Sequence, residues 1–388
     1  MSQRLTSIEV LISPSQIGST WLQQERLSTH MSKYPWHAAS RSTWRGQHDR
    51  VFVRIHTDDG AVGVGATRGT SAAVIILEHL AGLLRGRELG EHEALYEELA
   101  ASQLTYGWSG PAAAALSAID LALWDLRATA EGVPLSRLLA GGQPVREQLP
   151  CYVTVHPERL SGAAGLAGVK LAARFGPEDG PDAPARVADD IASVREAVGP
   201  QTLVMIDSAC SWTADFVDAM LSHLSDGQLD WLEDPLLPWD HTGYEAIKER
   251  VSGWAKAPKI CLGNYAFSAL EAQQVLTEGI VDVLQPDLTW VGGLTPALDL
   301  HQQAASRGVA FSPHYGAMHP WAVHLLAAIE QEELAEFVTT STAAQRDDYP
   351  GLPLPHKGWQ TVPPQSGAGA DLSPDILTGA ESQTIRLT

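Results

Sequence analysis

The second half of the chain alternates short apolar runs with longer helical patterns. Each apolar run is bounded by turn residues, which is typical of a buried strand, and helical patterns fill most of the gaps. Eight strands are predicted, near 149–154, 168–172, 203–207, 229–233, 259–263, 281–285, 309–312 and 335–339. This repeat of strand and helix predicts an α/β fold, namely a modified (β/α)8 barrel of parallel strands.

The first part of the chain places its strands before its helices, which is typical of a small α+β domain. Asp58-Asp59-Gly60 predicts a hairpin turn between the second and third strands. The predicted elements are three strands and then three helices, at 4–12, 51–56, 62–66, 72–86, 92–104 and 109–130. A polar segment at about 14–48 is too long for an ordinary loop, and its tryptophans and cations indicate a lid over a substrate.

These patterns divide the chain into three parts. Residues 1–140 are predicted to form an α+β capping domain with its lid, and residues 141–350 the catalytic barrel. The tail at 351–388, rich in proline and glycine, is expected to pack back on the capping domain. A length of 388 residues suits two domains of this kind.

Net charge and cysteine content limit which partners and metal sites the protein is expected to have. A net charge of −20 argues against nucleic acid or an anionic membrane as a partner, and it means that an anionic substrate needs local cations. The three cysteines lie far apart and favour reduced thiols over a disulfide or a zinc site. The N-terminal residues show no signal-peptide pattern, so we expect a cytoplasmic protein.

A polar residue closes, follows or lies within each of six consecutive predicted strands. For a single one, a helix N-cap or a solvated loop residue is an equally good explanation. Six in series favour an active site, because the C-terminal ends of barrel strands meet on one face. The six are Asp207, Glu233, Asn264, Asp287, His314 and Glu336.

The chemistry of these residues divides them into two groups. Asp207, Glu233 and Asn264 offer oxygen ligands to a hard divalent cation such as Mg²⁺. His314 is suited to proton transfer near neutral pH, and Asp287 on the adjacent strand is expected to orient its ring. A structural core histidine is the alternative.

Glu336 is expected to donate a hydrogen bond to a developing oxyanion if burial raises its pKa. Candidates for substrate binding are more weakly indicated, because surface charge or barrel packing explains them equally well. They are His30, Arg41, Lys170, Arg174 and Trp290.

Several segments resemble the enolase superfamily, in particular its mandelate racemase subgroup and the rhamnonate dehydratase type of acid-sugar dehydratase. The segments are Met31-Ser-Lys-Tyr, Asp120-Leu-Ala-Leu-Trp-Asp-Leu, Leu138-Leu-Ala-Gly-Gly, Trp231-Leu-Glu-Asp-Pro, Gln285-Pro-Asp, Gly292-Gly-Leu-Thr and Gly358-Trp-Gln-Thr-Val-Pro-Pro.

The resemblance implies a TIM-type (β/α)7β barrel, a homo-oligomer such as an octamer, and Mg²⁺ at Asp207, Glu233 and Asn264. It also implies an Asp287–His314 dyad and an electrophilic Glu336, acting on the proton next to a substrate carboxylate to give an enediolate.

Two departures from the subgroup bear on the reaction. Ala172 stands where a second lysine base is common, which favours a one-base dehydratase over a racemase or epimerase. Asn264 stands where glutamate is commoner, which leaves a bound cation more net charge to polarise a carboxylate.

We therefore expect dehydration of an aldonate, with L-rhamnonate favoured, to a 2-keto-3-deoxy acid. The alternatives are a racemase or epimerase and a non-catalytic barrel that binds a sugar acid. A zinc hydrolase is disfavoured, because no paired-histidine motif closes a strand.

Overall fold

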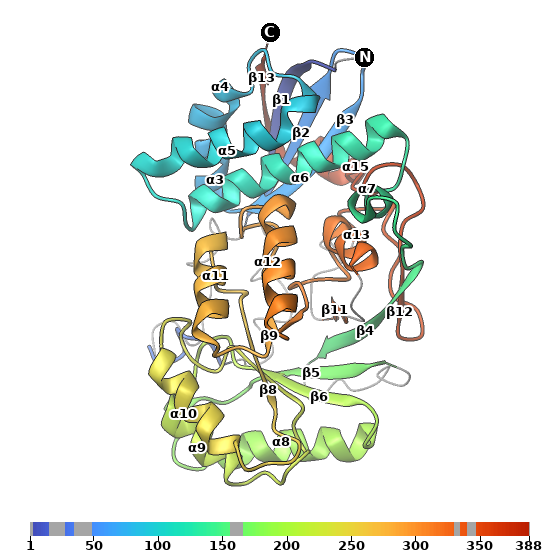
Figure 1. The fold of residues 1–388 in the computed structure, drawn as a ribbon. Helices are drawn as coiled ribbons and strands as arrows, with labels where there is room; N and C mark the ends of the chain where they lie inside the picture. Colours follow the sequence, from blue (N-terminus) through green and yellow to red (C-terminus); the bar gives the residue numbers. More distant parts are fainter. Residues whose placement is uncertain are drawn as a thin grey trace.

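The computed structural model describes residues 3–14, 28–34, 49–155, 166–329, 334–339 and 347–387. It contains an antiparallel sheet with helices on one side, placed over a curled parallel sheet (Figure 1). Both ends of the described chain lie in the antiparallel part (Figure 1). The predicted barrel with an α+β capping domain is confirmed.

The antiparallel sheet has the strand order β13-β1-β2-β3. Its members are β1 (Leu5–Ser13), β2 (Arg50–Thr57), β3 (Val62–Arg68) and β13 (Glu381–Arg386). The last strand of the chain pairs with the first, so the tail is part of this sheet. The helices of this part are α3 (Thr70–Ile75), α4 (Ala81–Leu83), α5 (His92–Ser102) and α6 (Pro111–Glu131). The helix expected at 72–86 is interrupted by a π-helical turn at Ile76–Leu80.

Two glycines of β3 let α6 lie directly against the sheet. A Cβ atom at Gly65 would collide with the carbonyl oxygen of Ala118, and one at Gly63 with that of Ala122. The sheet face beneath α6 is apolar, and α6 is apolar nearly throughout, so both surfaces are buried in one core. Such close backbone contact excludes any side chain larger than hydrogen at these positions.

The parallel sheet has the strand order β10-β9-β8-β7-β6-β5-β4-β11, with β12 antiparallel to β4. The strands are β4 (Gln148–Val155), β5 (Gly168–Ala172), β6 (Leu203–Asp207), β7 (Trp231–Glu233), β8 (Lys259–Leu262), β9 (Val283–Leu284), β10 (Ala310–Phe311), β11 (Ala335–Val338) and β12 (Trp359–Thr361). All eight strands predicted for the barrel are present at the predicted positions. In the described part of the chain no backbone pairing joins β10 to β11, but the Ser312 hydroxyl donates to the Leu334 carbonyl there (3.0 Å).

Helices surround this sheet (Figure 1). They are α7 (Leu135–Ala140), α8 (Ala183–Val198), α9 (Ala214–Leu221), α10 (His241–Val251), α11 (Ala269–Glu278), α12 (Leu294–Ser306) and α13 (Pro320–Ala328). The short helix α15 (Pro374–Gly379) instead contacts β1 of the antiparallel sheet. Among the described residues, no helix is both long and apolar enough to cross a membrane.

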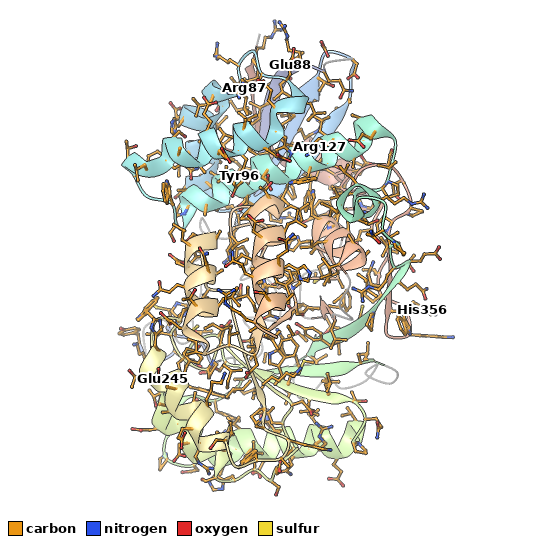
Figure 2. All side chains as sticks on the ribbon, in the orientation of Figure 1. Arg87, Glu88, Tyr96, Arg127, Glu245 and His356 are labelled. Carbon is orange, nitrogen blue, oxygen red and sulfur yellow. The ribbon has the colours of Figure 1, made fainter. Side chains whose placement is uncertain are left out.

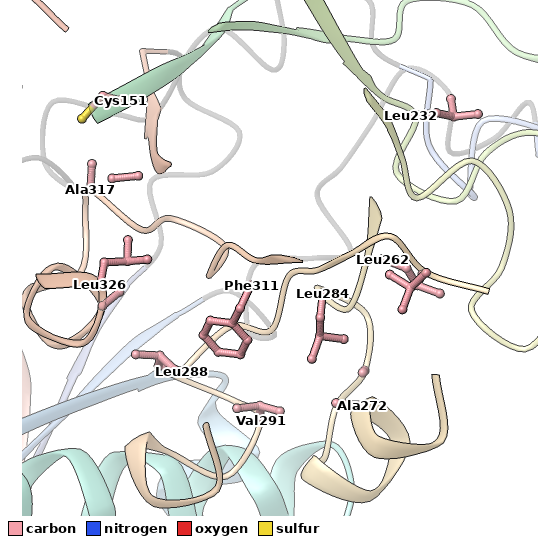
Figure 3. Packing of buried hydrophobic residues seen from close by; sticks show 14 of the residues in the cluster. Cys151, Leu232, Leu262, Ala272, Leu284, Leu288, Val291, Phe311, Ala317 and Leu326 are labelled. Carbon is pink, nitrogen blue, oxygen red and sulfur yellow. The ribbon is translucent and has the colours of Figure 1, made fainter. Parts of the chain in front are cut away.

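Each barrel strand presents alternate side chains to the two faces of the sheet. Leu232, Leu262, Leu284 and Phe311 belong to the large apolar cluster that also contains residues of the surrounding helices (Figure 3). A second, smaller cluster is made of Tyr152, Met205, Trp231, Cys261 and Val283, whose positions alternate with those of the first. This smaller cluster fills the barrel interior.

Two residues further along a strand, the same inner face continues to the C-terminal rim. Met205 is followed in this way by Asp207, and Trp231 by Glu233. The period of two therefore places the polar strand ends above an apolar floor and inside the barrel mouth.

The capping domain is fixed to the barrel through the N-terminal end of α12. The Asp120 carboxylate of α6 accepts hydrogen bonds from the backbone N–H of Thr295 (2.9 Å) and from its hydroxyl (2.6 Å). His92 contacts the same carboxylate (3.0 Å), and the Ser117 hydroxyl accepts from the Gly292 N–H (2.9 Å). An acid at a helix N-terminus is favourable, because it satisfies free N–H groups and complements the helix dipole.

A neighbouring acid of α6 connects three segments. Asp125 accepts hydrogen bonds from the backbone N–H of Val64 in β3 (2.8 Å) and of Ala368 in the tail (2.6 Å). Burial raises the pKa of Asp125 to about 6, although the two hydrogen bonds act to lower it.

Tyr96 of α5, labelled in Figure 2, also lies at the contact between the two domains, where its hydroxyl is close to Gly292 of the barrel.

We predict that Gly65→Ala lowers the free energy of unfolding by about 3 kcal/mol, because the added methyl group overpacks the contact between β3 and α6. Gly82→Ala is the matched control. Gly82 is exposed, has open space around its Cα and lies in α4, so alanine is expected to be neutral or to stabilise by about 0.5–1 kcal/mol. Urea unfolding measures both. Equal stability of the two variants would contradict the close packing.

Candidate active site

Acids gather at the rim where β6 and β7 end. Asp207 and Glu233 are register partners on these adjacent parallel strands. Carboxylate oxygens of Asp207, Glu233 and Asp234 all lie within 4.8 Å of one another. The amide oxygen of Asn264, just after β8, is buried and makes no hydrogen bond to the described residues. Three carboxylates therefore meet at the mouth of the barrel, and the unpartnered amide oxygen of Asn264 follows the end of the next strand.

The electrostatics of this group suit a cation. Burial raises the pKa values of Asp207, Glu233 and Asp234, and mutual repulsion of the carboxylates adds to the effect, although Lys170 opposes it. Three buried acids in contact are costly in their charged form unless positive charge compensates them. Carboxylate oxygens are hard donors, and the oxygens of Asp234 and Asn264 have no hydrogen-bond partner among the described residues. This set of ligands fits a divalent cation such as Mg²⁺.

Asp234 is a member of this cluster that the strand pattern does not reveal. Alternation along β7 would direct it away from Glu233, but its backbone has a φ of +40°, which ends the strand and turns the carboxylate back. Neither of its carboxylate oxygens has a hydrogen-bond partner among the described residues. Ala209, Cys210 and Tyr315 also have positive φ values, and all three follow strand ends. Strained backbone of this kind is concentrated at functional sites.

Lys170 lies inside the barrel and bridges two acids. Its Nζ atom contacts both carboxylate oxygens of Glu233 (2.7 Å each) and one of Glu336 (2.6 Å). The side chain is almost fully buried. Lys170 therefore belongs to the charged centre of the site rather than to the solvent-exposed surface.

The condition set for Glu336, a pKa raised by burial, is not met in this structure. Burial by itself would raise the pKa, but Lys170, His314 and the Thr154 hydroxyl outweigh it and lower the pKa of Glu336 to about 2. The carboxylate accepts from Thr154 (2.6 Å) and from the Tyr315 N–H (3.0 Å) as well as from Lys170. In this arrangement Glu336 is an ionised acceptor, and the proton donors of the site are its neighbours.

His314 and Asp287 form the expected pair. The Nδ1 atom of His314 lies 2.7 Å from one oxygen of Asp287. The other Asp287 oxygen accepts from the N–H and hydroxyl of Thr289 (2.7 and 2.6 Å). The carboxylate is held ionised, since these partners lower its pKa despite complete burial. An ionised Asp287 fixes the proton of the neutral imidazole on Nδ1, so Nε2 is the basic atom.

Trp290 joins the histidine to the capping domain. Its ring lies 5.5 Å from the His314 ring, and its indole N–H donates to the backbone carbonyl of Asn264 (2.9 Å). Trp290 also contacts Arg68, whose guanidinium carbon lies 3.6 Å from the centroid of the indole ring. Arg68 closes β3, so this contact brings the capping sheet over the barrel mouth.

Two cavities border Arg68 and Trp290. One, of about 490 Å³, is lined by residues of both domains, among them His30, Asn264 and Tyr265. The other, of about 160 Å³, extends toward Tyr315 and His319. The volume of the first cavity suits a small ligand. Its lining includes Asn264, just after β8, and Trp290, whose ring contacts that of His314.

The structure thus brings together most of the residues suggested by the sequence. Those gathered around the barrel mouth are Asp207, Glu233, Asn264, Asp287, His314, Glu336, Lys170, Trp290 and His30. Arg174 is not among them, because its guanidinium pairs with Asp190 of α8 (Nε to Oδ2 3.0 Å). Arg41 and most of the predicted lid lie outside the described residues.

Both parts of the chain match models of one protein family. Residues 158–376 match the enolase C-terminal domain-like family model. Residues 25–140 match the N-terminal domain model of mandelate racemase / muconate lactonizing enzyme. The chain belongs to this family, that is, to the enolase superfamily and its mandelate racemase subgroup.

Within the family, the chain is similar to rhamnonate dehydratases. A Caldivirga maquilingensis protein, provisionally named L-rhamnonate dehydratase, is 31% identical over 90% of this chain and 88% of its own length. The L-rhamnonate dehydratase of Saccharopolyspora erythraea is 28% identical over 93% of each chain. The crystal structure of the Gibberella zeae rhamnonate dehydratase complexed with Mg has a TM-score of 0.87 and 27% identity, covering 99% of this chain and 97% of that one.

We predict that Lys170→Met destabilises the metal-free protein more at pH 8 than at pH 5. In the wild type, the low pKa of Glu336 contributes stability that is fully present above the unfolded-state value of 4.5. Without Lys170 the buried carboxylates have raised pKa values, so the folded state loses stability as the pH rises above that value. Melting temperatures in EDTA at the two pH values measure the effect. A pH-independent difference would show that Lys170 acts only through packing.

Proposed function

We propose that this protein is a Mg²⁺-dependent acid-sugar dehydratase, with L-rhamnonate the first substrate to assay. The observation that carries the proposal is the placement of the His314–Asp287 pair and the Asp207–Glu233 acids at one barrel mouth. The proposal is supported by the dehydratases among the similar proteins, one of which was crystallised with Mg.

The proposed cation ligands are Asp207, Glu233 and Asn264, with Asp234 alongside them. When bound there, Mg²⁺ supplies positive charge that makes the hydrogen next to a substrate carboxylate more acidic. Lys170 and Glu336 hold each other in place beside the ligands, so that Glu233 keeps a fixed orientation. With a cation held by these ligands, the carboxylate end of an acid sugar would lie toward the cation and its second carbon toward His314.

The reaction that we propose uses one residue as both base and acid. The Nε2 atom of neutral His314 takes the proton from the second carbon, and the bond electrons form an enediolate. As the bond between the third carbon and its hydroxyl breaks, imidazolium returns the proton to the departing oxygen, and water leaves. The resulting enol becomes a 2-keto-3-deoxy acid. Asp287 stabilises the imidazolium throughout without accepting its proton.

The same-fold alternative, a racemase or epimerase, needs a second base opposite His314. Ala172 closes β5 next to Asp207 and carries no ionisable group. Lys170 is two residues earlier on the same face, but its Nζ atom is committed to Glu233 and Glu336. A one-base elimination is therefore favoured by the described residues.

We predict that Asn264→Ala weakens Mg²⁺ binding by about tenfold and that Asn264→Glu strengthens it, because the first removes an oxygen ligand and the second adds negative charge. Isothermal titration of the metal-free protein with MgCl₂ measures both variants. Asp234→Asn is the comparison that identifies the third ligand. If Asp234→Asn abolished binding while Asn264→Ala left it unchanged, Asp234 rather than Asn264 would hold the cation.

We predict that His314→Asn abolishes both release of 2-keto acid and exchange of the substrate α-hydrogen with D₂O. Asparagine approximates the polar shape of the ring but cannot take a proton, so a loss of at least about 100-fold is expected. Assays use L-rhamnonate and other acid sugars with Mg²⁺, scored by 2-keto acid release and by NMR. If the wild type exchanged the α-hydrogen with D₂O but released no 2-keto acid, the racemase would be favoured. If the His314→Asn variant kept full activity, His314 would have no part in the mechanism.

A further inference from the structure

Arg68 is a charged residue at the site that the proposed reaction leaves without a role. It closes β3 of the capping domain and borders both cavities described above. Its guanidinium carbon lies 3.6 Å from the ring centroid of Trp290. Among the described residues, no carboxylate forms an ion pair with Arg68, and no hydrogen bond of its guanidinium is found.

Asp287, the carboxylate that attracts Arg68 most strongly, forms no ion pair or hydrogen bond with it. Asp287 attracts the guanidinium, but both Asp287 oxygens already accept hydrogen bonds, from His314 and from Thr289. Burial lowers the pKa of Arg68, with Asp287 acting against the shift. Arginine nevertheless stays charged in proteins, so a half-buried cation without an anionic partner among the described residues is present beside the cavities.

Stacking prepares this guanidinium to bind an anion. Contact with the indole ring covers one face of the planar group and leaves the N–H donors at its edge available. These donors match a carboxylate, which can accept two of them at once. His30 lines the same cavity and lies 6.5 Å from Tyr265, ring to ring, so further polar groups surround the space.

The position of Arg68 relative to the reacting groups indicates which part of a substrate it would meet. Both Arg68 and His314 contact Trp290, but they come from different domains. The cation ligands bind the carboxylate next to the reacting carbon. Arg68 and the ligand Asn264 line the same cavity from different domains, so a substrate held by the cation ligands on the barrel side can extend its other end to Arg68 on the side of the capping domain.

We propose that Arg68 binds a second carboxylate at the far end of the acid sugar, so that the enzyme prefers dicarboxylic aldarates to aldonates. This inference rests on the proposed dehydratase function and narrows its substrate class. L-rhamnonate ends in a methyl group, which leaves the guanidinium unpaired. An aldarate supplies the anion that the protein itself does not.

The test compares matched substrates that differ only in the terminal group: galactarate with galactonate, and glucarate with gluconate. We expect the Mg²⁺-loaded wild type to have the higher kcat/KM for the diacid in at least one pair. Arg68→Met should lower kcat/KM for that diacid by about 10- to 100-fold, mainly through KM, and change the monoacid by less than about threefold. Arg68→Lys should show an intermediate loss, because it keeps the charge without the paired donors.

Arg54→Met is the matched control. Arg54 lies on β2 of the same sheet but pairs with Glu9 (2.7 Å), so its loss should not change the preference between diacid and monoacid. The inference is overturned if Arg68→Met lowers activity equally on both members of each pair. It is also overturned if the wild type prefers the monoacid in every pair.

Binding measurements separate this inference from the proposed reaction. His314→Asn loaded with Mg²⁺ is titrated with each acid, alone and combined with Arg68→Met. Turnover without preference for diacids would overturn the role of Arg68 and leave the dehydratase intact. Arg68-dependent binding of diacids by a wild type that dehydrates none of them would overturn the reaction but support the recognition. Absence of binding by any of the acids would overturn both.

Discussion

The Asp120 carboxylate holds the two domains in the register on which the site depends. It lies on a helix of the capping domain and accepts hydrogen bonds from the N-terminal end of a barrel helix. Gly293 permits this approach, because its φ of +104° and missing Cβ leave room for the acid. With that contact in place, the end of β3 lies over the barrel mouth and Arg68 meets Trp290. A shift between the domains would separate the cation of the cap from the acids and the histidine of the barrel.

The charges at the barrel mouth form a second constraint. Asp207, Glu233, Asp234 and Glu336 are concentrated around one lysine in a protein whose net charge is already −20. Such a centre is stabilised when cations enter it or when some of its acids take up protons, and the first of these matches the function that we propose. Lys170 contributes one positive charge, Mg²⁺ would contribute two more, and the substrate carboxylate would balance the metal. Arg68 is a further positive group nearby, contributed by the capping domain and stacked on Trp290.

The sequence predicted the order of elements and most of the barrel-mouth residues for a simple reason. Parallel strands in a barrel end on the same rim, so a polar residue at each strand end reaches a common face without any knowledge of side-chain packing. The period of two within each strand then places Asp207 and Glu233 on the inner side. Family segments such as Asp120-Leu-Ala-Leu-Trp-Asp-Leu also acquire a physical meaning here, because Asp120 and Asp125 fasten α6 to the barrel, to β3 and to the tail.

The amino-acid sequence was therefore sufficient to predict the part of the site that lies on consecutive strands of one sheet. Three other features depend on how the chain folds. The positive φ of Asp234 turns a carboxylate against the strand alternation. The burial of Lys170 between two acids keeps Glu336 ionised, opposite to the pKa direction expected from burial alone. The stacking of Arg68 on Trp290 joins residues of different domains that are far apart along the chain. Local patterns cannot show these features, because backbone reversal, charge compensation and contact between domains all depend on neighbours that only the folded chain brings together.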